Sequence, residues 1–311
     1  MEKKIPVIID TDLGDDIDDA FALCLAAQSP EIQLLGVTTV HRCPQYRAKM
    51  AKALLNAAGM QVPVHAGIAK PLKVQTVHGK TLNYTQKPLS WAEEFASIEY
   101  DGNDAVDFLV KTIESSQEKV TLVTLGALTN VATLIMRRPD LKEKIQLSIM
   151  GGAFLRNWGE YNFSCDPDAA DIILQSGIQA RCVGIDITFQ CKLSGDLLGK
   201  IANHTHPCLQ MLSRMRCMWE WGVLLHDPLA LMSVFDPSFV TWEKMVCAVE
   251  TQGKCANGYV VNFSDSNFGQ DASSSNLSVG IAVDSDRFVR EYVRRVSSFE
   301  KESCLTKKKC G

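Results

Sequence analysis

The stretch IPVIIDTDLGDDIDDAFALCLAA, from Ile5 to Ala27, decides how the rest of the chain is expected to fold. Its apolar start, Ile5 to Ile9, predicts a buried parallel strand, and the apolar residues from Ala20 to Ala27 predict a helix. Between the two lies an acidic turn whose aspartates are Asp10, Asp12, Asp15, Asp16, Asp18 and Asp19. We therefore expect a strand, an acidic loop and a helix in this order.

The acidic turn predicts a metal site. Many like charges in one turn are costly unless a cation neutralises them. Aspartates at a helix start also cap free N–H groups, but capping accounts for one or two of these residues. Hard oxygen ligands favour Ca²⁺ or Mg²⁺ over zinc. The position of the turn supports a site, because ligands of open α/β sheets bind at the carboxyl ends of the strands.

Composition excludes several classes of function. A hydrophobic fraction of 46% in 311 residues is enough for a sizeable core. The net charge of −4 gives no basic surface for nucleic acid, and no apolar run approaches the length of a membrane span. The 11 cysteines contain no C-x-x-C pair, and Met1 to Lys4 leads directly into the first strand. We expect a cytoplasmic protein with reduced cysteines and no signal peptide.

Strand and helix patterns alternate through the first part of the chain. The predicted strands are 5–9, 34–40, 62–64, 120–125, 145–150 and 180–187, and the predicted helices are 20–27, 46–58, 104–115, 129–136 and 168–176. This order predicts the α/β class, with an open, mostly parallel sheet flanked by helices. Residues 70–100 are expected to be mostly loop.

The second half is expected to be more helical. Helices are predicted at 194–202, 207–220, from about 227, and at 287–296, and strands at 245–250, 259–263 and 277–283. Without a repeat or a clear linker, we expect one domain over 1–302 and a disordered tail over 303–311.

Further polar residues follow other predicted strands. Gly151-Gly152 is followed by Asn157, Glu160 and Asn162, and His226-Asp227-Pro228 comes after an apolar run. Each feature alone is more typical of a turn or a helix cap. Together they form a candidate site with acids for a metal, amides for hydroxyl groups and one imidazole.

These motifs resemble the signatures of the inosine-uridine preferring nucleoside hydrolases. The resemblance covers nearly the whole chain and rests on Asp10-Thr11-Asp12-Leu13-Gly14, Asp18-Asp19-Ala20, Met150-Gly151-Gly152-Ala153, Glu160-Tyr161-Asn162 and His226-Asp227-Pro228. It implies a Rossmann-like nucleoside hydrolase fold that binds Ca²⁺. The implied reaction is hydrolysis of the N-glycosidic bond of a ribonucleoside, giving free base and ribose. A homodimer or homotetramer is also implied.

The resemblance also implies roles for single residues. Asp12 is expected to bind Ca²⁺ and to act as general base on the attacking water. The further metal ligands would be Asp19, Asp227 and the carbonyl oxygen of Leu125. Substrate contacts would come from Asp18, Asn157, Glu160 and Asn162 at the ribose, and from His226 near the base, where it would assist departure of the leaving group.

The sequence departs from the family pattern in three places. Leu13 stands where the family usually has proline. The acidic loop is two residues longer, and Asp16, which has the right spacing from Asp12, is therefore a rival metal ligand to the pair Asp18 and Asp19. Cys43 stands where the family usually has an asparagine that touches the ribose, and a thiol cannot make the same hydrogen bonds. Two alternatives follow: His41 or Arg42 replaces that asparagine, or the sugar differs from ribose.

Two other functions stay open at this point. The first is a non-catalytic or altered-substrate binder that keeps the fold and the metal. Cys43, at the position of the usual asparagine, is the feature that keeps this alternative open. A haloacid dehalogenase-type phosphohydrolase would use Asp10 as nucleophile, because that family also carries an Asp-x-Asp turn after its first strand. The phosphohydrolase function gives no role to Gly151-Gly152 or to His226-Asp227-Pro228.

Overall fold

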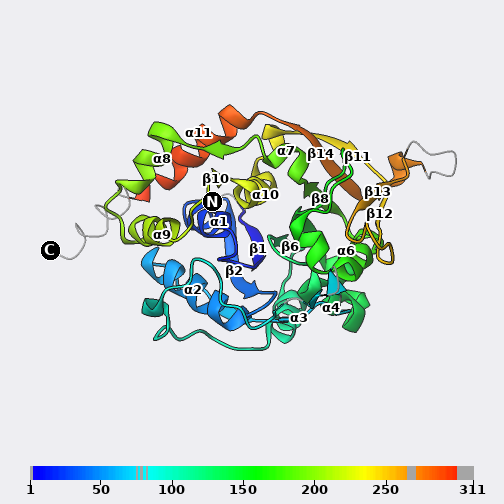
Figure 1. The fold of residues 1–311 in the computed structure, drawn as a ribbon, viewed down its shortest axis with the longest axis horizontal. Helices are drawn as coiled ribbons and strands as arrows, with labels where there is room; N and C mark the ends of the chain where they lie inside the picture. Colours follow the sequence, from blue (N-terminus) through cyan, green and yellow to red (C-terminus); the bar gives the residue numbers. More distant parts are fainter. Residues whose placement is uncertain (1–2, 75, 78–79, 82, 265–270, 300–311) are drawn as a thin grey trace.

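An eight-stranded sheet runs through the middle of the molecule (Figure 1). The computed structural model describes residues 3–74, 76–77, 80–81, 83–264 and 271–299. The tail predicted over 303–311 lies outside these residues, and the single domain predicted over 1–302 stays a prediction.

The sheet is open and mostly parallel, as the alternating pattern predicted. In spatial order its strands are β11 (Val240–Lys244), β14 (Leu277–Val283), β8 (Ala180–Val183), β7 (Ile145–Met150), β6 (Val120–Thr124), β1 (Ile5–Thr11), β2 (Ile32–Thr39) and β3 (Val64–Ala66). Every neighbouring pair is parallel except β11 and β14. The central strands are apolar because helices cover both faces of a parallel sheet.

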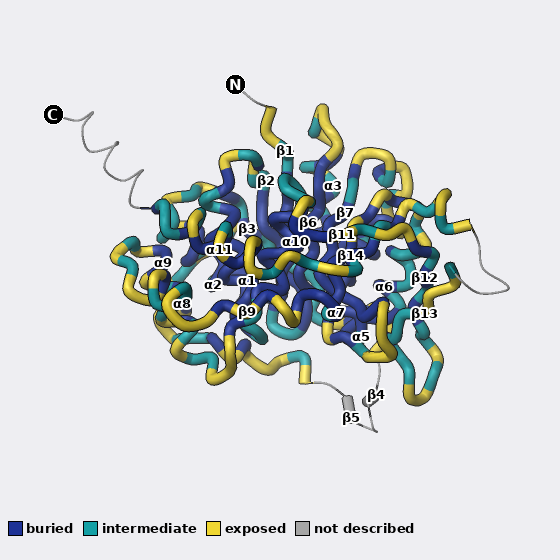
Figure 2. The backbone as a smooth tube through the Cα atoms, turned by 90° about the horizontal axis from the view of Figure 1, so that it is seen from above, coloured by how far each residue is buried: buried dark blue, intermediate teal, exposed yellow. Residues whose placement is uncertain are grey.

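Helices pack on both faces of the sheet, and two apolar clusters result. One cluster takes residues from α1 (Asp18–Ala27), α2 (Pro44–Ala57), α8 (Gly195–Ala202), α9 (Pro207–Cys217), α10 (His226–Phe235) and α11 (Ser285–Val296). The other takes residues from α3 (Ala105–Ser115), α4 (Thr129–Arg137) and α6 (Pro167–Leu174). Along β1, Val7 and Ile9 join the first cluster and Ile8 joins the second, as side-chain alternation in a strand requires. Figure 2 shows the buried backbone along these strands.

Shorter elements complete the chain. They are β4 (Thr76–Val77) and β5 (Lys80–Thr81), β9 (Lys192–Leu193) and β10 (Val223–Leu224), β12 (Cys247–Val249) and β13 (Val260–Asn262), α5 (Tyr161–Cys165), α7 (Ile185–Thr188), and the 3₁₀ turns η1 (Glu93–Phe95), η2 (Pro139–Lys144), η3 (Pro237–Phe239) and η4 (Ala272–Ser274). The sequence analysis had no signal for β11 or α5. No helix among the described residues is long and apolar enough to cross a membrane.

One strand prediction is wrong in its second part. The apolar run 180–187 forms a strand only to Val183, and α7 begins at Ile185. The carboxylate of Asp186 accepts hydrogen bonds from the backbone N–H of Phe154 at 2.6 Å and from Nε of Arg156 at 3.0 Å. Polar contacts with the loop after β7 therefore turn the chain out of the sheet, and apolar periodicity does not report them.

Arg295 on α11 provides a test of how the last helix is attached. Its guanidinium donates to both carboxylate oxygens of Glu31, at 2.7 and 3.0 Å, and lies 4.9 Å from the ring centre of Phe235. Burial raises the pKa of Glu31, but the hydrogen bonds from Arg295 outweigh it and hold that pKa below its ordinary value of 4.5. A carboxylate whose pKa is lowered by folding stabilises the folded state at pH values above its unfolded-state pKa. This stabilisation is lost as the pH falls through the folded-state pKa.

We expect Arg295→Met to reduce the free energy of unfolding by about 0.5–1 kcal/mol at pH 7, because the pair is partly screened by solvent. The difference from the wild-type protein should shrink as the pH falls below 4.5. Urea unfolding at pH 7 and pH 3.5 measures both values. Arg294→Met is the matched control, since Arg294 pairs with Glu291 at the surface. An Arg295→Met deficit that does not change with pH would contradict the ion-pair explanation.

Candidate active site

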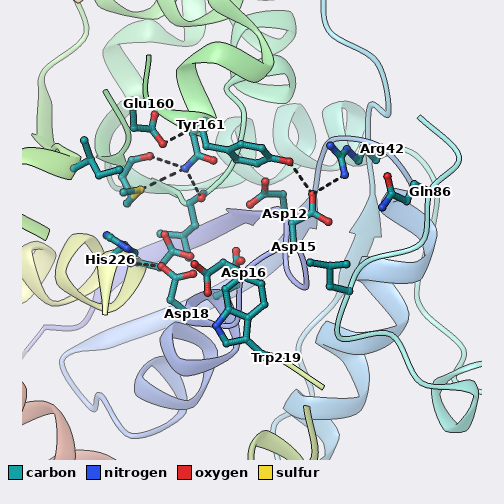
Figure 3. A pocket seen from close by; sticks show the side chains of 17 residues that line it. Asp12, Asp15, Asp16, Asp18, Arg42, Gln86, Glu160, Tyr161, Trp219 and His226 are labelled. Carbon is teal, nitrogen blue, oxygen red and sulfur yellow. Dashed lines mark hydrogen bonds and ion pairs between the residues drawn. The ribbon is translucent and has the colours of Figure 1, made fainter. Parts of the chain in front are cut away.

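A cavity of about 410 Å³ opens at the carboxyl ends of β1, β6 and β7 (Figure 3). Its walls carry all the aspartates of the acidic turn except Asp10. They also carry Leu125, Glu160, Asn162, His226 and Asp227. The structure therefore brings together most of the site residues that the sequence analysis selected from distant segments.

The acidic loop is shaped by contacts at the end of β1. The hydroxyl of Thr11 donates to the Asp19 carboxylate, and the N–H of Leu13 donates to the same hydroxyl at 3.1 Å. Asp18 and Asp19 occupy the first turn of α1, where the helix dipole favours negative charge. The loop between them and Asp12 is thus held close to the strand end.

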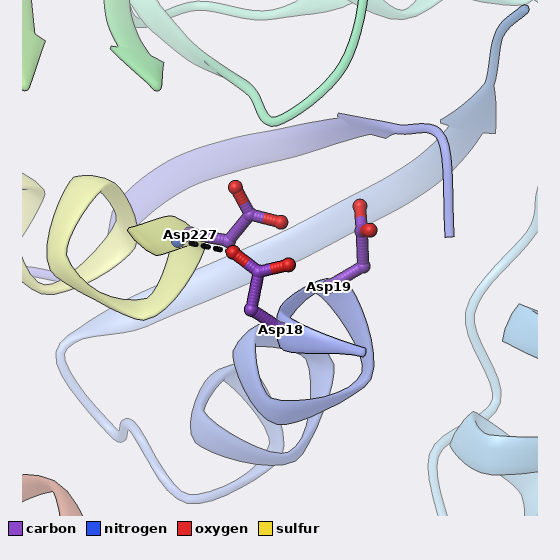
Figure 4. A group of neighbouring side chains, drawn as sticks. All are labelled: Asp18, Asp19 and Asp227. Atoms are coloured by element: carbon purple, nitrogen blue, oxygen red, sulfur yellow. Dashed lines mark hydrogen bonds between the residues drawn. The ribbon is translucent and has the colours of Figure 1, made fainter. Parts of the chain in front are cut away.

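Three buried aspartates form the cluster best suited to a cation. Asp18, Asp19 and Asp227 each offer an oxygen within 4.8 Å of the others, and the N–H of Asp227 donates to Asp18 at 3.1 Å (Figure 4). Burial, together with neighbouring carboxylates, raises the pKa of Asp18 and of Asp227 well above the usual range. Burial also raises the pKa of Asp19, to about 7. A hard divalent cation fits this set of oxygens and would relieve their repulsion.

Asp12 and the Leu125 carbonyl lie at the neighbouring strand ends. Asp12 is buried, and a side chain at Gly126 would meet its backbone nitrogen at 2.9 Å, so the close approach of the two loops requires glycine there. Burial and the Asp19 carboxylate raise the pKa of Asp12. The carbonyl oxygen of Leu125 accepts a hydrogen bond from Nδ2 of Asn162 at 2.8 Å.

The two additional acidic residues point to different partners. Asp16 lines the cavity and accepts from the N–H of Ile17, but it lies outside the three-aspartate cluster. Asp15 accepts from Arg47 at 2.8 Å and from the Tyr161 hydroxyl at 3.0 Å. Burial raises the pKa of Asp15, but the two arginines beside it, Arg47 and Arg42, bring the net value below the usual range. Asp15 is thus an ionised partner of arginine.

Glu160 caps α5 and fixes the residues around it. Its carboxylate accepts from the N–H groups of Gly152 at 2.8 Å, Asn162 at 2.8 Å and Phe163 at 3.0 Å. Gly152 has a φ of +78°, a conformation that favours glycine. Asn157, also selected from the sequence, is exposed and does not line the cavity.

His226 lies at the start of α10, on the cavity wall. Its Nδ1 is 2.6 Å from the hydroxyl of Thr188, and its ring meets the ring of Phe189 edge-on, with centroids 5.7 Å apart. Burial lowers the pKa of His226 to about 4. The imidazole is therefore neutral at physiological pH. Trp219 also lines the cavity, and its Nε1 donates to the carbonyl of Gly222 at 3.3 Å.

In the segment after β2, Cys43 stands where the family usually has an asparagine that touches the ribose, but its side chain lies elsewhere. The thiol of Cys43 lies 3.7 Å from the carbonyl of Tyr84 and does not line the cavity, whereas Arg42 does. Arg42 was one of the two residues that the sequence analysis offered in place of the family asparagine, whereas Arg47, which is completely buried, was not selected from the sequence. An arginine in an amphipathic helix usually lies at the surface, so its residue type gave no signal.

Comparisons with known proteins show which family the chain resembles in sequence and in fold. A model of the family described as inosine-uridine preferring nucleoside hydrolase matches residues 7–290. Uridine nucleosidase 1 of Arabidopsis thaliana is 36% identical, over 81% of this chain and 80% of its own length. The pyrimidine-specific ribonucleoside hydrolase RihA of Salmonella gallinarum is 31% identical, over 95% and 99%. The structure of a purine-preferring ribonucleoside hydrolase from Gardnerella vaginalis superposes with a TM-score of 0.78 at 25% identity, covering 94% of this chain and 98% of that one.

Proposed function

Because this chain belongs to the inosine-uridine preferring nucleoside hydrolase family and is a hydrolase of N-glycosyl bonds, we propose that it cleaves ribonucleosides to base and ribose with the help of Ca²⁺. The observation that carries the calcium proposal is the buried cluster of Asp18, Asp19 and Asp227 in the same cavity as Asp12 and His226.

The residues that would hold the cation are Asp12, Asp19, Asp227 and the Leu125 carbonyl, with Asp16 as the rival ligand. Asp18 belongs to the same cluster of oxygens, and we propose that it binds a ribose hydroxyl. When bound, the cation would supply positive charge that orients the ribose diol and makes a water easier to deprotonate. Oxygen ligands and a buried, acidic environment favour calcium over a transition metal.

Asp12 is the proposed general base. Burial raises its pKa, and a carboxylate with a raised pKa is a better proton acceptor. Asp12 would take the proton from the attacking water while the bond between C1′ and the base nitrogen breaks. The ribose then develops oxocarbenium character, which the buried carboxylate of Glu160 and the amide oxygen of Asn162 would stabilise electrostatically. Asn157 stays a proposed ribose contact, although it is exposed here.

His226 would assist departure of the base. With a pKa of about 4 it is neutral at pH 7 and acts as a hydrogen-bond donor, without carrying a positive charge. We assign the Thr188 hydroxyl as the donor to Nδ1, which places the imidazole proton on Nε2. The Nε2–H group would donate a hydrogen bond to the leaving base and stabilise the negative charge that develops on it, and the departed base would then take its proton from water.

The phosphohydrolase alternative lacks support. It needs Asp10 as a nucleophile in the cavity, but Asp10 does not line it. One oxygen of the Asp10 carboxylate accepts from Thr38 at 2.6 Å and from Asn130 at 2.8 Å. These contacts give Asp10 a positioning role below the acidic loop.

The test is release of reducing sugar from uridine, cytidine, inosine and adenosine, with and without a calcium chelator. We expect ribose release that falls at least tenfold with the chelator and returns when Ca²⁺, but not Zn²⁺, is added. Uridine is expected to be preferred, because the two relatives above 30% identity are named for uridine or pyrimidine substrates, whereas the purine-preferring enzyme is 25% identical. Calcium binding itself is measured by calorimetry.

The possible results separate the proposals. Chelator-resistant release would contradict the calcium requirement while leaving the hydrolase activity intact. No release from any nucleoside, with calcium still bound, would favour the non-catalytic or altered-substrate binder. The homodimer or homotetramer stays a prediction that light scattering would test. The cytoplasmic location stays a prediction that cell fractionation would test.

A further inference from the structure

Asn130 is a completely buried polar side chain to which the proposed reaction gives no role. It is the second residue of α4 and does not line the cavity. Its Nδ2 donates to the Asp10 carboxylate at 2.8 Å and to the carbonyl of Thr39 at 3.1 Å, and its Oδ1 accepts from the N–H of Ile68 at 3.0 Å. Two acceptors face the amide nitrogen and one donor faces the amide oxygen, so the partners fix the orientation of the side chain.

The backbone makes room for this amide at Gly67. A side chain at position 67 would begin 2.5 Å from both polar atoms of Asn130, which is too close for any carbon. The N–H of Gly67 donates at 2.9 Å to the same Thr39 carbonyl that Asn130 contacts. Asn130 therefore joins the carboxyl ends of β1 and β2 to the loop that follows β3.

On one side, the Asn130 amide holds the end of β1. The Asp10 oxygen that it contacts also accepts from the hydroxyl of Thr38 at 2.6 Å. The backbone carbonyl of Asp10 accepts from the N–H of Leu125 at 2.7 Å. Asp12, the proposed base, follows Asp10 by two residues, and Leu125 carries the carbonyl that is proposed as a metal ligand. The positions of both groups therefore depend on how Asp10 is held.

On the other side, the Asn130 amide supports the bend after β2. Ile68 donates its N–H to Asn130, and its carbonyl accepts from the N–H of His41 at 2.8 Å. The N–H of Arg42 donates to the carbonyl of Ala69, also at 2.8 Å. His41 and Arg42 have φ values of +66° and +50°, and two such residues in succession persist only where the surroundings hold them.

We propose that Asn130 is a positioning residue for the hydrolytic reaction, because through Asp10 and Ile68 it determines where the Asp12 carboxylate and the bend at Arg42 meet the cavity. The inference rests on the proposed function, which it deepens. A reacting group displaced by about 1 Å can cost about a hundredfold in rate. The position needs two donors and one acceptor on one short side chain, and asparagine supplies them.

The main variant is Asn130→Asp, which keeps the shape of the side chain and the acceptor for Ile68 but removes both donors. We expect kcat for a ribonucleoside to fall about tenfold to a hundredfold, with KM changed less than about threefold. The double variant Asp10→Asn/Asn130→Asp exchanges donor and acceptor across the same contact and should recover part of kcat. All rates are measured well below the melting temperature of each variant.

Two further variants keep the test decisive. Tyr292→Phe is the matched control, because it removes one buried hydrogen bond, from the Tyr292 hydroxyl to the carbonyl of Phe21 at 3.0 Å, away from the cavity. It should lower the melting temperature and leave kcat unchanged. Thr38→Val removes the other donor to Asp10 and replaces Asn130→Asp if that variant does not fold, with an expected loss in kcat of about threefold to tenfold.

Hydrogen exchange of backbone amides gives a readout that needs no turnover. In Asn130→Asp the amides of Ile68 and His41 should exchange faster than in the wild type, and in Tyr292→Phe they should not. If the wild type cleaves no nucleoside, the proposed function fails, but this local effect together with weaker Ca²⁺ binding would still support the positioning of Asp12. A kcat that falls no further than in Tyr292→Phe, or a loss that the double variant does not recover, would overturn the inference.

Discussion

Asp12→Asn is expected to lower kcat for ribonucleoside hydrolysis about a thousandfold, because the proposed general base is removed while the shape of the side chain is kept. This corresponds to about 4 kcal/mol of transition-state stabilisation. Asp12 is buried and its carboxylate lines the cavity beside the three-aspartate cluster. An amide cannot take a proton from water at neutral pH, so raising the substrate concentration should not restore the rate.

The same variant separates the two roles proposed for Asp12. Calorimetry with Ca²⁺ reports the loss of a ligand, and single-turnover kinetics at saturating Ca²⁺ reports the loss of the base. Asp107→Asn is the matched control, since Asp107 pairs with Arg137 at the surface. A kcat for Asp12→Asn within tenfold of the wild type would eliminate Asp12 as the base and direct attention to Asp18 or Asp19.

The fold was largely predictable from apolar patterning. The β1 run and the strand runs at 120–125 and 145–150 are short, apolar and followed by glycine or acidic residues, and they form the centre of the sheet. Prediction failed where polar contacts between distant segments decide the backbone. Asp186 holds the loop after β7, and this contact ends the run 180–187 at Val183.

The site was predictable to the extent that its residues stand at strand ends. Asp12 was selected because it follows a predicted strand, whereas the roles of Asp19, Asp227 and His226 came from the family resemblance. The structure places all four on one cavity. Arg42 was named only as a substitute for the family asparagine, and Arg47 was missed, because the position of both side chains depends on how the chain bends after β2. The bend at His41 and Arg42 needs left-handed backbone at two ordinary residues, which residue type alone does not predict.

Arg47 holds the acidic loop from below. Its side chain is completely buried on α2. The guanidinium donates to the backbone carbonyls of Asp12, of Leu13 at 3.0 Å and of His41 at 2.9 Å, and to the Asp15 carboxylate at 2.8 Å. One side chain thus ties together the loop after β1 and the loop after β2, and it neutralises an acid that the longer loop introduces.

Arg47→Met should therefore reduce the free energy of unfolding by about 3–5 kcal/mol, because it leaves the partly buried Asp15 carboxylate and three carbonyls without their partner. Urea unfolding measures the loss, with Arg290→Met on the exposed side of α11 as control. The double variant Arg47→Met/Asp15→Asn should recover part of the stability, since the unpaired charge at Asp15 is then removed. If the double variant is instead less stable than Arg47→Met alone, Arg47 stabilises the protein through its contacts with the carbonyls and not through compensation of the Asp15 charge. The longer acidic loop would then be tolerated through its backbone hydrogen bonds.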